Sequence, residues 1–170
     1  MEIRKTRMEE IDQVMAIYAY ARQFMADHGK PNQWGQTKPV REQIVKDIQS
    51  GDSYVCVEKD QIAAVFYYRE GIDPTYLQIY DGAWRDEKAY GVVHRIAAAG
   101  KVKGAGSFCL NWAFEQCHNL KIDTHRDNVV MQNTLKKNGF VYCGIIHLEN
   151  GDERLAYQKM MEESFTSYPE

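Results

Sequence analysis

The residues with the clearest potential for chemistry are glycines and lysines between a predicted strand and a predicted helix. Residues 100–106 read Gly-Lys-Val-Lys-Gly-Ala-Gly, and Ser107 follows them. Unpaired backbone amides at a helix start point outward with positive potential, and glycine lets an anion approach the backbone closely. Lys101 and Lys103 would add positive charge. The segment therefore predicts a phosphate or pyrophosphate site, although a plain strand-to-helix turn would also use such glycines.

Two well-known phosphate loops can be tested against this segment. The nucleoside triphosphate loop requires Gly-x-x-x-x-Gly-Lys-Ser/Thr, and Ala105 stands where its second glycine belongs. The dinucleotide fingerprint requires a third glycine, and Cys109 occupies that position. Asp123 lies near the offset expected for its ribose-binding acid. The first loop is excluded, and a small nucleotide-binding domain remains an alternative.

One histidine and several polar residues around it are further candidates. His94 lies in the strand predicted before the glycine loop, and histidine can accept a proton near physiological pH. A packed strand histidine would look the same in sequence. Asp123, His125 and Asp127 could suggest metal ligands, but strand alternation and helix capping explain them, and no second His or Cys cluster completes a site. We therefore expect no metal.

Aromatic residues concentrate in two segments predicted to be loops. One segment carries Trp34, and the other, residues 72–87, carries Tyr76, Tyr80 and Trp84. Aromatic side chains can form the wall of a binding pocket, and they are also ordinary core material. We interpret residues 72–87 as a loop that lines a binding surface.

Length and charge limit the class of protein. The chain has 170 residues and a net charge of −3, which correspond to one domain and argue against an electrostatic grip on nucleic acid. Its four cysteines form no Cys-x-x-Cys pair, which favours a reduced protein. The charged first ten residues and the absence of an apolar run of about 18 residues argue against a signal peptide and a membrane span. We therefore expect a cytoplasmic protein without nucleic-acid or membrane partners.

Hydrophobic periodicity predicts strands and helices that follow one another as an α/β domain. Apolar residues recur every three or four positions from Met8 to Met25, and Thr6 and Glu9 would form a capping box before this helix. Runs of β-branched and aromatic residues predict the strands, with short polar turns between them. Residues 162–170 are expected to be a loose tail. The expected helices cover 8–25, 40–49, 107–117 and 128–137, and the expected strands cover 2–5, 54–58, 62–69, 90–98, 120–124, 140–148 and 154–160.

Three features, taken in order, resemble the GNAT superfamily of acyl-CoA-dependent N-acetyltransferases. Residues 94–98 look like the central strand of that family, and residues 103–107 resemble its pyrophosphate loop. Asn128 followed by Gly139-Phe140 is similar to its Asn-containing helix. The resemblance implies one domain over residues 1–161, with a mixed, strongly twisted sheet of about six to seven strands and about four flanking helices.

The resemblance also implies acetyl-CoA as co-substrate and names the residues that would hold it. The end of the central strand would bond the pantetheine arm, the loop amides would bind the pyrophosphate, and two asparagines would contact the cofactor further along. Lys103 stands where the family has Gln or Arg, and Phe108 where it has a small residue, so a register through Lys101, Gly104 and Gly106 stays open. The implied set is Ile96, Ala97, Ala98, Lys103, Gly104, Ala105, Gly106, Ser107, Asn128 and Asn133.

The implied reaction is transfer of the acetyl group to a primary amine of a small molecule or peptide. A base must accept the proton of the amine, and an acid can protonate the departing thiolate. His94 and Tyr142 are the candidates for these catalytic roles, with His125 as a further acid. The tyrosine that often serves as acid in this family is Leu135 here, so a non-catalytic acyl-CoA-binding or sensor domain remains the alternative.

The resemblance places three aromatic residues on the acceptor side, where they would contact the amine. A homodimer through the terminal strands also stays open. The predicted substrate-binding residues are Trp34, Tyr80 and Trp84.

Overall fold

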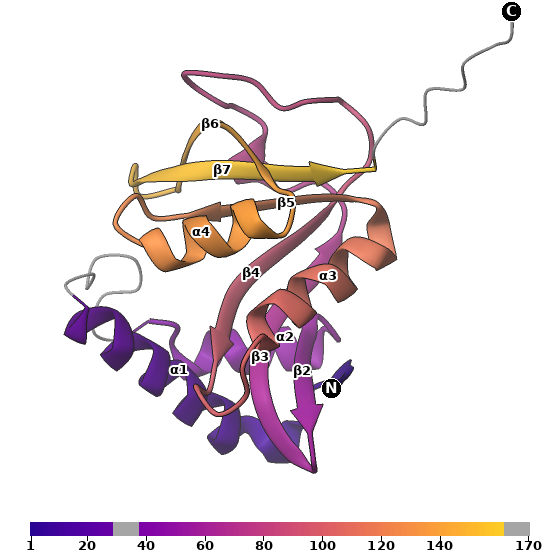
Figure 1. Ribbon diagram of the computed structural model, residues 1–170, viewed down its shortest axis with the longest axis vertical. Helices are drawn as coiled ribbons and strands as arrows, with labels where there is room; N and C mark the ends of the chain where they lie inside the picture. Colours follow the sequence, from indigo (N-terminus) through magenta and orange to yellow (C-terminus); the bar gives the residue numbers. More distant parts are fainter. Residues whose placement is uncertain (29–37, 162–170) are drawn as a thin grey trace, which may run out of the picture.

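Strands and helices occupy the predicted segments in the computed structural model, which describes residues 1–28 and 38–161 (Figure 1). The predicted tail, residues 162–170, lies outside the described residues. The helices are α1 (Ile11–Asp27), α2 (Arg41–Gln49), α3 (Ala105–Cys117) and α4 (Val129–Lys137), with short 3-10 turns at Met8–Glu10 and Pro74–Tyr76. The strands are β1 (Glu2–Lys5), β2 (Ser53–Glu58), β3 (Gln61–Glu70), β4 (Gly91–Ala98), β5 (Asn119–Thr124), β6 (Val141–His147) and β7 (Glu153–Met160).

The strands form a single mixed sheet in the order β1-β2-β3-β4-β5-β7-β6. Neighbouring strands are antiparallel except β4 and β5, which run parallel with α3 as the crossover between them. The sheet is strongly twisted. In Figure 1, β2 and β3 run across the direction of β5 and β7. The expected fold class, a mixed sheet flanked by four helices within the described residues, is confirmed.

Alternating side chains on the strands build a core on each face of the sheet. In β3, Ala64 and Phe66 pack in a cluster with Leu110 of α3 and Leu135 of α4. Val65 points to the opposite face and packs in a second cluster with α1 and α2. Burying side chains of this size contributes about 1.5–3 kcal/mol each. The two clusters fix α1 and α2 on one face and α3 and α4 on the other.

The loop between β3 and β4 covers the remaining face of the second half of the sheet. Its Tyr76 is buried in a third cluster with Val92, Ile146 and Ala156. Trp84 and Tyr90 from the same loop pack against this cluster. The aromatic loop predicted to line a surface is therefore also a part of the core.

The predicted capping box before α1 is wrong. The Thr6 hydroxyl lies 2.8 Å from the Ser53 hydroxyl, and Glu9 takes no part in a cap. Instead, the backbone amide of Arg7 donates to Glu10 Oε1 at 2.8 Å, and the Arg4 guanidinium binds both carboxylate oxygens of Glu10. Because the helical segment begins one residue later than predicted, Glu10 rather than Glu9 accepts the hydrogen bond from the backbone.

The two parallel strands part soon after they begin. β4 and β5 pair only at Gly91 and Val92, and Figure 1 shows β4 descending away from β5 beyond that point. The register of β4 against β3 also shifts in its middle, where Arg95 has a positive φ of 48°. The Tyr18 hydroxyl of α1 donates to the Arg95 carbonyl at 2.8 Å and holds this irregular turn of the strand. The sheet therefore opens into a wedge beside the second half of β4.

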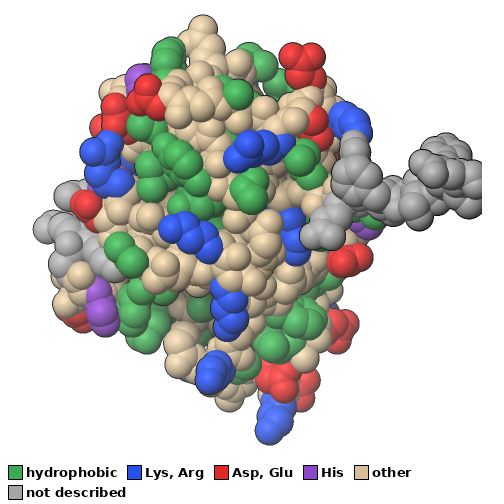
Figure 2. Space-filling model, turned by 45° about the horizontal axis from the view of Figure 1, so that its top comes forward, with side chains coloured by type: hydrophobic (Ala, Val, Ile, Leu, Met, Phe, Trp, Pro, Cys, Tyr) green, Lys and Arg blue, Asp and Glu red, His purple; other side chains and the backbone are tan. Residues whose placement is uncertain are grey.

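The surface of the molecule carries both charged and apolar side chains. Figure 2 shows a face on which Lys and Arg side chains are separated by apolar and uncharged surface, while Asp and Glu lie toward its edges. Within the described residues, no helix combines the length and apolar character needed to cross a bilayer. The four cysteines, all in that part of the chain, are free thiols.

Candidate active site

The wedge between β4 and β5 holds two adjoining cavities. The first, of about 280 Å³, lies between α1, the end of β4 and the start of α4, and we call it the α1–α4 cavity. The second, of about 400 Å³, is lined by the middle of β4, the end of β5 and the residues before α2. Because it contains His94, we call it the His94 cavity. Ile96 and Met131 line both, so the two cavities meet at these side chains.

The α1–α4 cavity has a largely apolar wall. Phe24 and Met25 line it from one face of α1, and the predicted cofactor residues Ile96–Ala98 line it from β4. Asn128, also predicted, caps α4 by accepting a hydrogen bond from the Met131 amide at 3.1 Å and lines the same cavity. The other predicted asparagine, Asn133, is exposed and lines neither of these two cavities. The structure thus gathers the strand residues and Asn128, but not Asn133.

The glycine loop leads into α3, as predicted, but the helix begins at Ala105, two residues earlier than expected. Gly104 is the residue before the helix and has a left-handed φ of 82°, a conformation that glycine adopts without strain. Phe108 makes the first hydrogen bond of the helix, to the Gly104 carbonyl at 2.9 Å. Among the described residues, the amides of residues 105–107 have no hydrogen-bond partner. These amides are available to bind an anion, and Lys101 and Lys103 are exposed beside them.

Gly106 supplies a test of whether this helix start fits a phosphate. It lies inside α3, its φ is not positive, and an added Cβ would meet no atom within 4 Å. The fold therefore has no use for glycine at this position, and glycine in a helix is unfavourable. A ligand that must approach the backbone closely would use it. The residues present fit a bound pyrophosphate, and both registers left open by the sequence include Gly104 and Gly106.

His94 forms a close pair with a carboxylate from the aromatic loop. Its Nε2 lies 2.6 Å from Asp73 Oδ2. The other oxygen of Asp73 accepts hydrogen bonds from the Thr75 amide at 2.9 Å and the Thr75 hydroxyl at 2.7 Å. Burial of the Asp73 carboxyl opposes its ionisation, but the hydrogen bonds from His94 and Thr75 outweigh this effect and hold its pKa at about 2. Asp73 therefore stays ionised and can only accept, so the proton in this pair lies on Nε2.

A second carboxylate faces the other nitrogen of the imidazole. Asp123 Oδ2 lies 3.9 Å from His94 Nδ1, too far for a hydrogen bond, and accepts one from the Tyr76 hydroxyl at 2.6 Å. Burial, together with the charge of Asp123, raises the pKa of Tyr76, so its hydroxyl remains a donor. Among the described residues, the remaining oxygen of Asp123 has no hydrogen-bond partner. The site thus offers a free imidazole nitrogen on His94 and a free carboxylate oxygen on the neighbouring Asp123.

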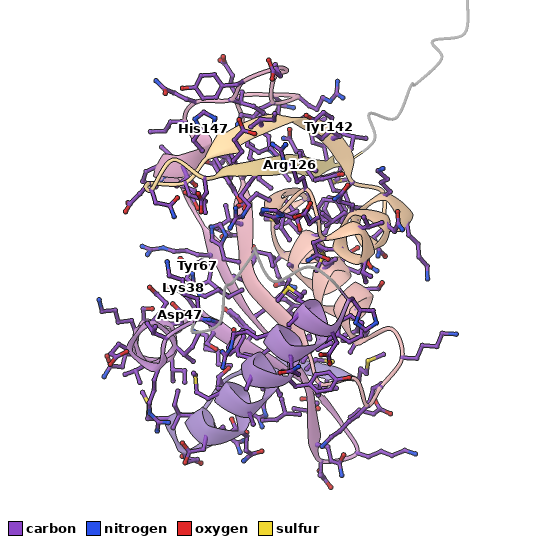
Figure 3. The ribbon with its side chains drawn as sticks, turned by 90° about the vertical axis from the view of Figure 1, so that its left-hand side faces the viewer. Lys38, Asp47, Tyr67, Arg126, Tyr142 and His147 are labelled. Atoms are coloured by element: carbon purple, nitrogen blue, oxygen red, sulfur yellow. The ribbon has the colours of Figure 1, made fainter. Side chains whose placement is uncertain are left out.

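Basic side chains also line the His94 cavity. Arg95 is paired with Asp47 through two hydrogen bonds of 2.8 and 2.9 Å and lies over the Tyr67 ring. Figure 3 shows Lys38 close to this group, at the edge of the cavity formed by the residues before α2. Arg154 lines the cavity from β7. No group of three or more His, Cys, Asp or Glu side chains suited to a metal ion occurs within the described residues.

Sequence reasoning identified His94 but missed its partner. Asp73 precedes Pro74, a pair typical of a turn, and the loop that returns it to β4 leaves no periodic signal. The short 3-10 turn explains its place, because Asp73 caps that turn and is held there by Thr75. Asp123 was weighed for two other kinds of site, and the structure shows it beside the histidine.

Several predicted residues lie away from the His94 cavity. Tyr142 is exposed on β6 and packs against Tyr157, and Figure 3 shows it in the upper part of the molecule, far from Lys38. Tyr80 stacks on His147 and does not line the cavity.

The structure also shows the positions of Trp84 and Leu135. Trp84 packs against Tyr76 and donates its indole N–H to the Tyr76 carbonyl at 2.8 Å, outside the His94 cavity. Leu135, at the family's acid position, is fully buried in the core. Trp34 lies outside the described residues. The structure thus brings neither Tyr142 nor the two described aromatic candidates to His94.

The depressed pKa of Asp73 predicts a change of stability in acid. Its value of about 2 lies below the ordinary 3.8, so the stabilisation is present above that ordinary value and is lost as the pH falls through about 2. The shift corresponds to about 2 kcal/mol. The advantage of the wild type over Asp73→Asn in unfolding free energy should therefore shrink by about 2 kcal/mol between about pH 6 and pH 2, measured by urea denaturation. Asp60→Asn, in the exposed β2–β3 turn, should follow the wild type, and a pH-independent difference for Asp73→Asn would contradict this prediction.

Known structures share this fold and, in one case, a substantial part of the sequence. An acetyltransferase of the GNAT family from Streptococcus agalactiae 2603 is 34% identical, with a TM-score of 0.86 over 95% of this chain and 96% of that one. Ribosomal-protein-alanine N-acetyltransferase from Brucella melitensis is 17% identical, with a TM-score of 0.64 over 95% of this chain and 100% of the other. A chain in the structure of the NatC complex bound to Gag peptide and CoA is 12% identical, with a TM-score of 0.60 over 95% and 100% of the two chains.

The last two likenesses show the fold alone. Comparison with protein-family models and with curated proteins gives no match. The first likeness joins sequence identity to nearly complete coverage of both chains, and the wedge, the glycine loop and the predicted element order agree with it. The chain belongs to the GNAT family of acetyltransferases.

Proposed function

We propose that this protein transfers the acetyl group of acetyl-CoA to a primary amine of a small molecule or peptide. The observation that carries the proposal is the junction of the two cavities at Ile96 and Met131. On one side of the junction lie an apolar channel and an anion-binding helix start, and on the other lies the pair of His94 and Asp73. A donor and an acceptor that entered from opposite sides would meet at this point.

The acetyl-CoA side would use mainly backbone groups. The amides of residues 105–107 would bind the pyrophosphate, with Lys101 and Lys103 adding charge around it. The unpaired edge of β4 over Ile96–Ala98 would hydrogen-bond the pantetheine arm, since β5 has left this edge free. Asn128 lines the same channel. When bound, acetyl-CoA supplies a thioester whose C–S bond breaks as the new C–N bond forms.

His94 is suited to accept the proton of the amine. With its Nε2–H donated to the ionised Asp73, the lone pair of Nδ1 is available for a proton. The imidazolium that forms would lie between two carboxylates, at 2.6 Å from Asp73 and 3.9 Å from Asp123. Asp73 thereby acts as a positioning residue that fixes the tautomer and stabilises the charged form of His94.

Asp123 would bind the incoming amine. Its free oxygen lines the His94 cavity, and its side chain is only 11% exposed, so an ammonium placed there would be attracted strongly. The same position brings the nitrogen next to His94 Nδ1. The NatC neighbour was solved with a peptide, and the Brucella neighbour is named for a protein alanine, which supports amines of peptides as well as of small molecules as the range to test.

The thiolate side of the reaction has no acid in the expected place. Leu135 is in the core and Tyr142 is remote, so the thiolate would take its proton from solvent or from the imidazolium of His94.

The absence of the usual tyrosine favours the second candidate function, an acyl-CoA sensor without turnover. Release of free thiol from acetyl-CoA over a panel of amino acids, polyamines, aminoglycosides and peptides separates the two functions.

The four free cysteine thiols support a reducing compartment such as the cytoplasm as the location of the protein.

Substitution of Gly106 should separate folding from cofactor binding. Gly106→Ala should raise the unfolding free energy by about 0.5–1 kcal/mol, because alanine is the better helix former and its Cβ meets nothing. It should also weaken CoA binding by about 10-fold, since the Cβ would obstruct the approach of the pyrophosphate. Denaturant melts and calorimetric titration with CoA measure the two effects. Glu115→Ala, on an exposed part of the same helix, should leave CoA affinity unchanged, and tight CoA binding by Gly106→Ala would refute the assigned loop.

Replacement of His94 should remove the base and spare the fold. His94→Ala should lower kcat/KM for the best amine by about 100-fold or more, within the usual range for a general base, and leave CoA affinity unchanged. His118→Ala, an exposed histidine at the end of α3, is the matched control. An unchanged kcat/KM in His94→Ala would remove this residue from the mechanism.

A further inference from the structure

Lys121 stands out because it is a buried cation that no carboxylate neutralises. It lies on β5, only 4% exposed, on the face covered by the aromatic loop. Its ammonium nitrogen is 3.9 Å from the centre of the Tyr90 ring and 4.3 Å from the centre of the Trp84 ring. Aromatic faces attract a cation but accept no ordinary hydrogen bond from it. The lysine is therefore held in place without satisfaction of its three N–H donors.

The surrounding polar groups are engaged elsewhere. Among the described residues, no carboxylate oxygen lies within 4.0 Å of the ammonium, and no hydrogen-bond acceptor binds it. Asp86 is the acid whose charge acts on Lys121, and its carboxylate accepts hydrogen bonds from Asn119 and Gln158. Burial lowers the pKa of Lys121, and the charge of Asp86 opposes this effect. A buried ammonium in this state is costly unless an acceptor completes it.

The ammonium faces a cavity of its own. This cavity, of about 600 Å³, lies between β5 and the aromatic loop and shares no lining residue with the His94 cavity. No fully buried side-chain nitrogen in the described part of the chain lacks a partner, so the unpartnered nitrogen of Lys121 must be open to this space. Tyr76 separates the two cavities, with its ring against Trp84 on one side and near His94 on the other.

The rim of the cavity is apolar. Ile72 and Leu77 are 76% and 68% exposed, although both are large hydrophobic residues, and both line the cavity. Ile79 and Trp84 continue the apolar wall inward. Asp86, Glu87 and Lys88 also line the cavity, and their formal charges cancel when Lys121 is included. The cavity thus joins an apolar entrance to one buried cation.

We propose that this cavity, which we call the Lys121 site, binds a small organic acid with an apolar body. The carboxylate would accept hydrogen bonds from the Lys121 ammonium, and the body would pack between Ile72 and Leu77. A phosphate without an apolar part would leave the rim uncovered, and an uncharged ligand would leave the ammonium unsatisfied. The site does not depend on acetyl transfer, because it uses none of the residues assigned to that reaction.

Matched acids and amides test this assignment. Titration calorimetry of the full chain would use phenylacetate and 4-methylpentanoate, with phenylacetamide and 4-methylpentanamide as uncharged counterparts. The acids should bind about 10-fold or more tightly than the amides, because only the carboxylate pairs with the ammonium. Lys121→Met keeps most of the length of the side chain without its charge and should abolish this difference. Lys46→Met, an exposed lysine of α2, should retain it.

A second variant keeps the test decisive if Lys121→Met fails to fold. The double substitution Ile72→Ser and Leu77→Ser changes only exposed side chains and should weaken binding of acid and amide alike by about 10-fold. The proposal is overturned if the wild type binds the acids no better than the amides or binds neither. It is also overturned if folded Lys121→Met keeps the preference for acids, or if the double variant binds them as the wild type does.

Discussion

The early parting of β4 and β5 is the constraint on which the rest of the site depends. Parallel strands normally continue to pair along their length, and here the ladder ends after Val92. Beyond that residue one edge of β4 is left with backbone groups that β5 cannot satisfy. The irregular backbone at Arg95, held by the Tyr18 hydroxyl, directs the strand away from β5. A ligand that offers polar groups along an extended arm can take the place of the missing strand.

The same opening explains why the two halves of the site have different chemistry. The α1–α4 cavity is largely apolar, while the proposed anion site consists of backbone amides at the start of α3. Ionisable side chains line the His94 cavity. An acidic protein with a net charge of −3 can bind an anionic cofactor in this way, because the positive potential is local and comes mainly from the helix start.

The reactive pair of His94 and Asp73 depends on the core beneath it. Asp73 and Tyr76 come from the loop that covers the second half of the sheet, and the burial of Tyr76 fixes both the hydroxyl on Asp123 and the turn that carries Asp73. Core packing and the proposed catalytic pair therefore depend on the same loop. A side chain that loosened Tyr76 would disturb two carboxylates at once.

Much of the fold could be predicted from the sequence, because apolar periodicity and turn residues act locally. The helices, the strands and the position of Asn128 follow from such signals, although α3 begins two residues earlier than expected. The pairing of His94 with Asp73 could not be predicted, since it joins residues 21 positions apart through a loop without periodicity. Tyr142 follows α4 closely in the sequence, and only the tertiary fold shows that it lies far from Lys38 at the edge of the His94 cavity. The capping error at Glu9 has a similar origin, because a 3-10 turn moves the contact by one residue.

Backbone amide hydrogen exchange with and without CoA tests the central claim most directly. If the parted edge of β4 and the start of α3 hold the cofactor, CoA should slow exchange mainly at residues 96–98 and 104–107, where amides gain a hydrogen-bond partner. The aromatic loop over residues 72–90 should change little. Binding of CoA without slower exchange at these two segments, or with protection confined to other parts of the chain, would contradict the account.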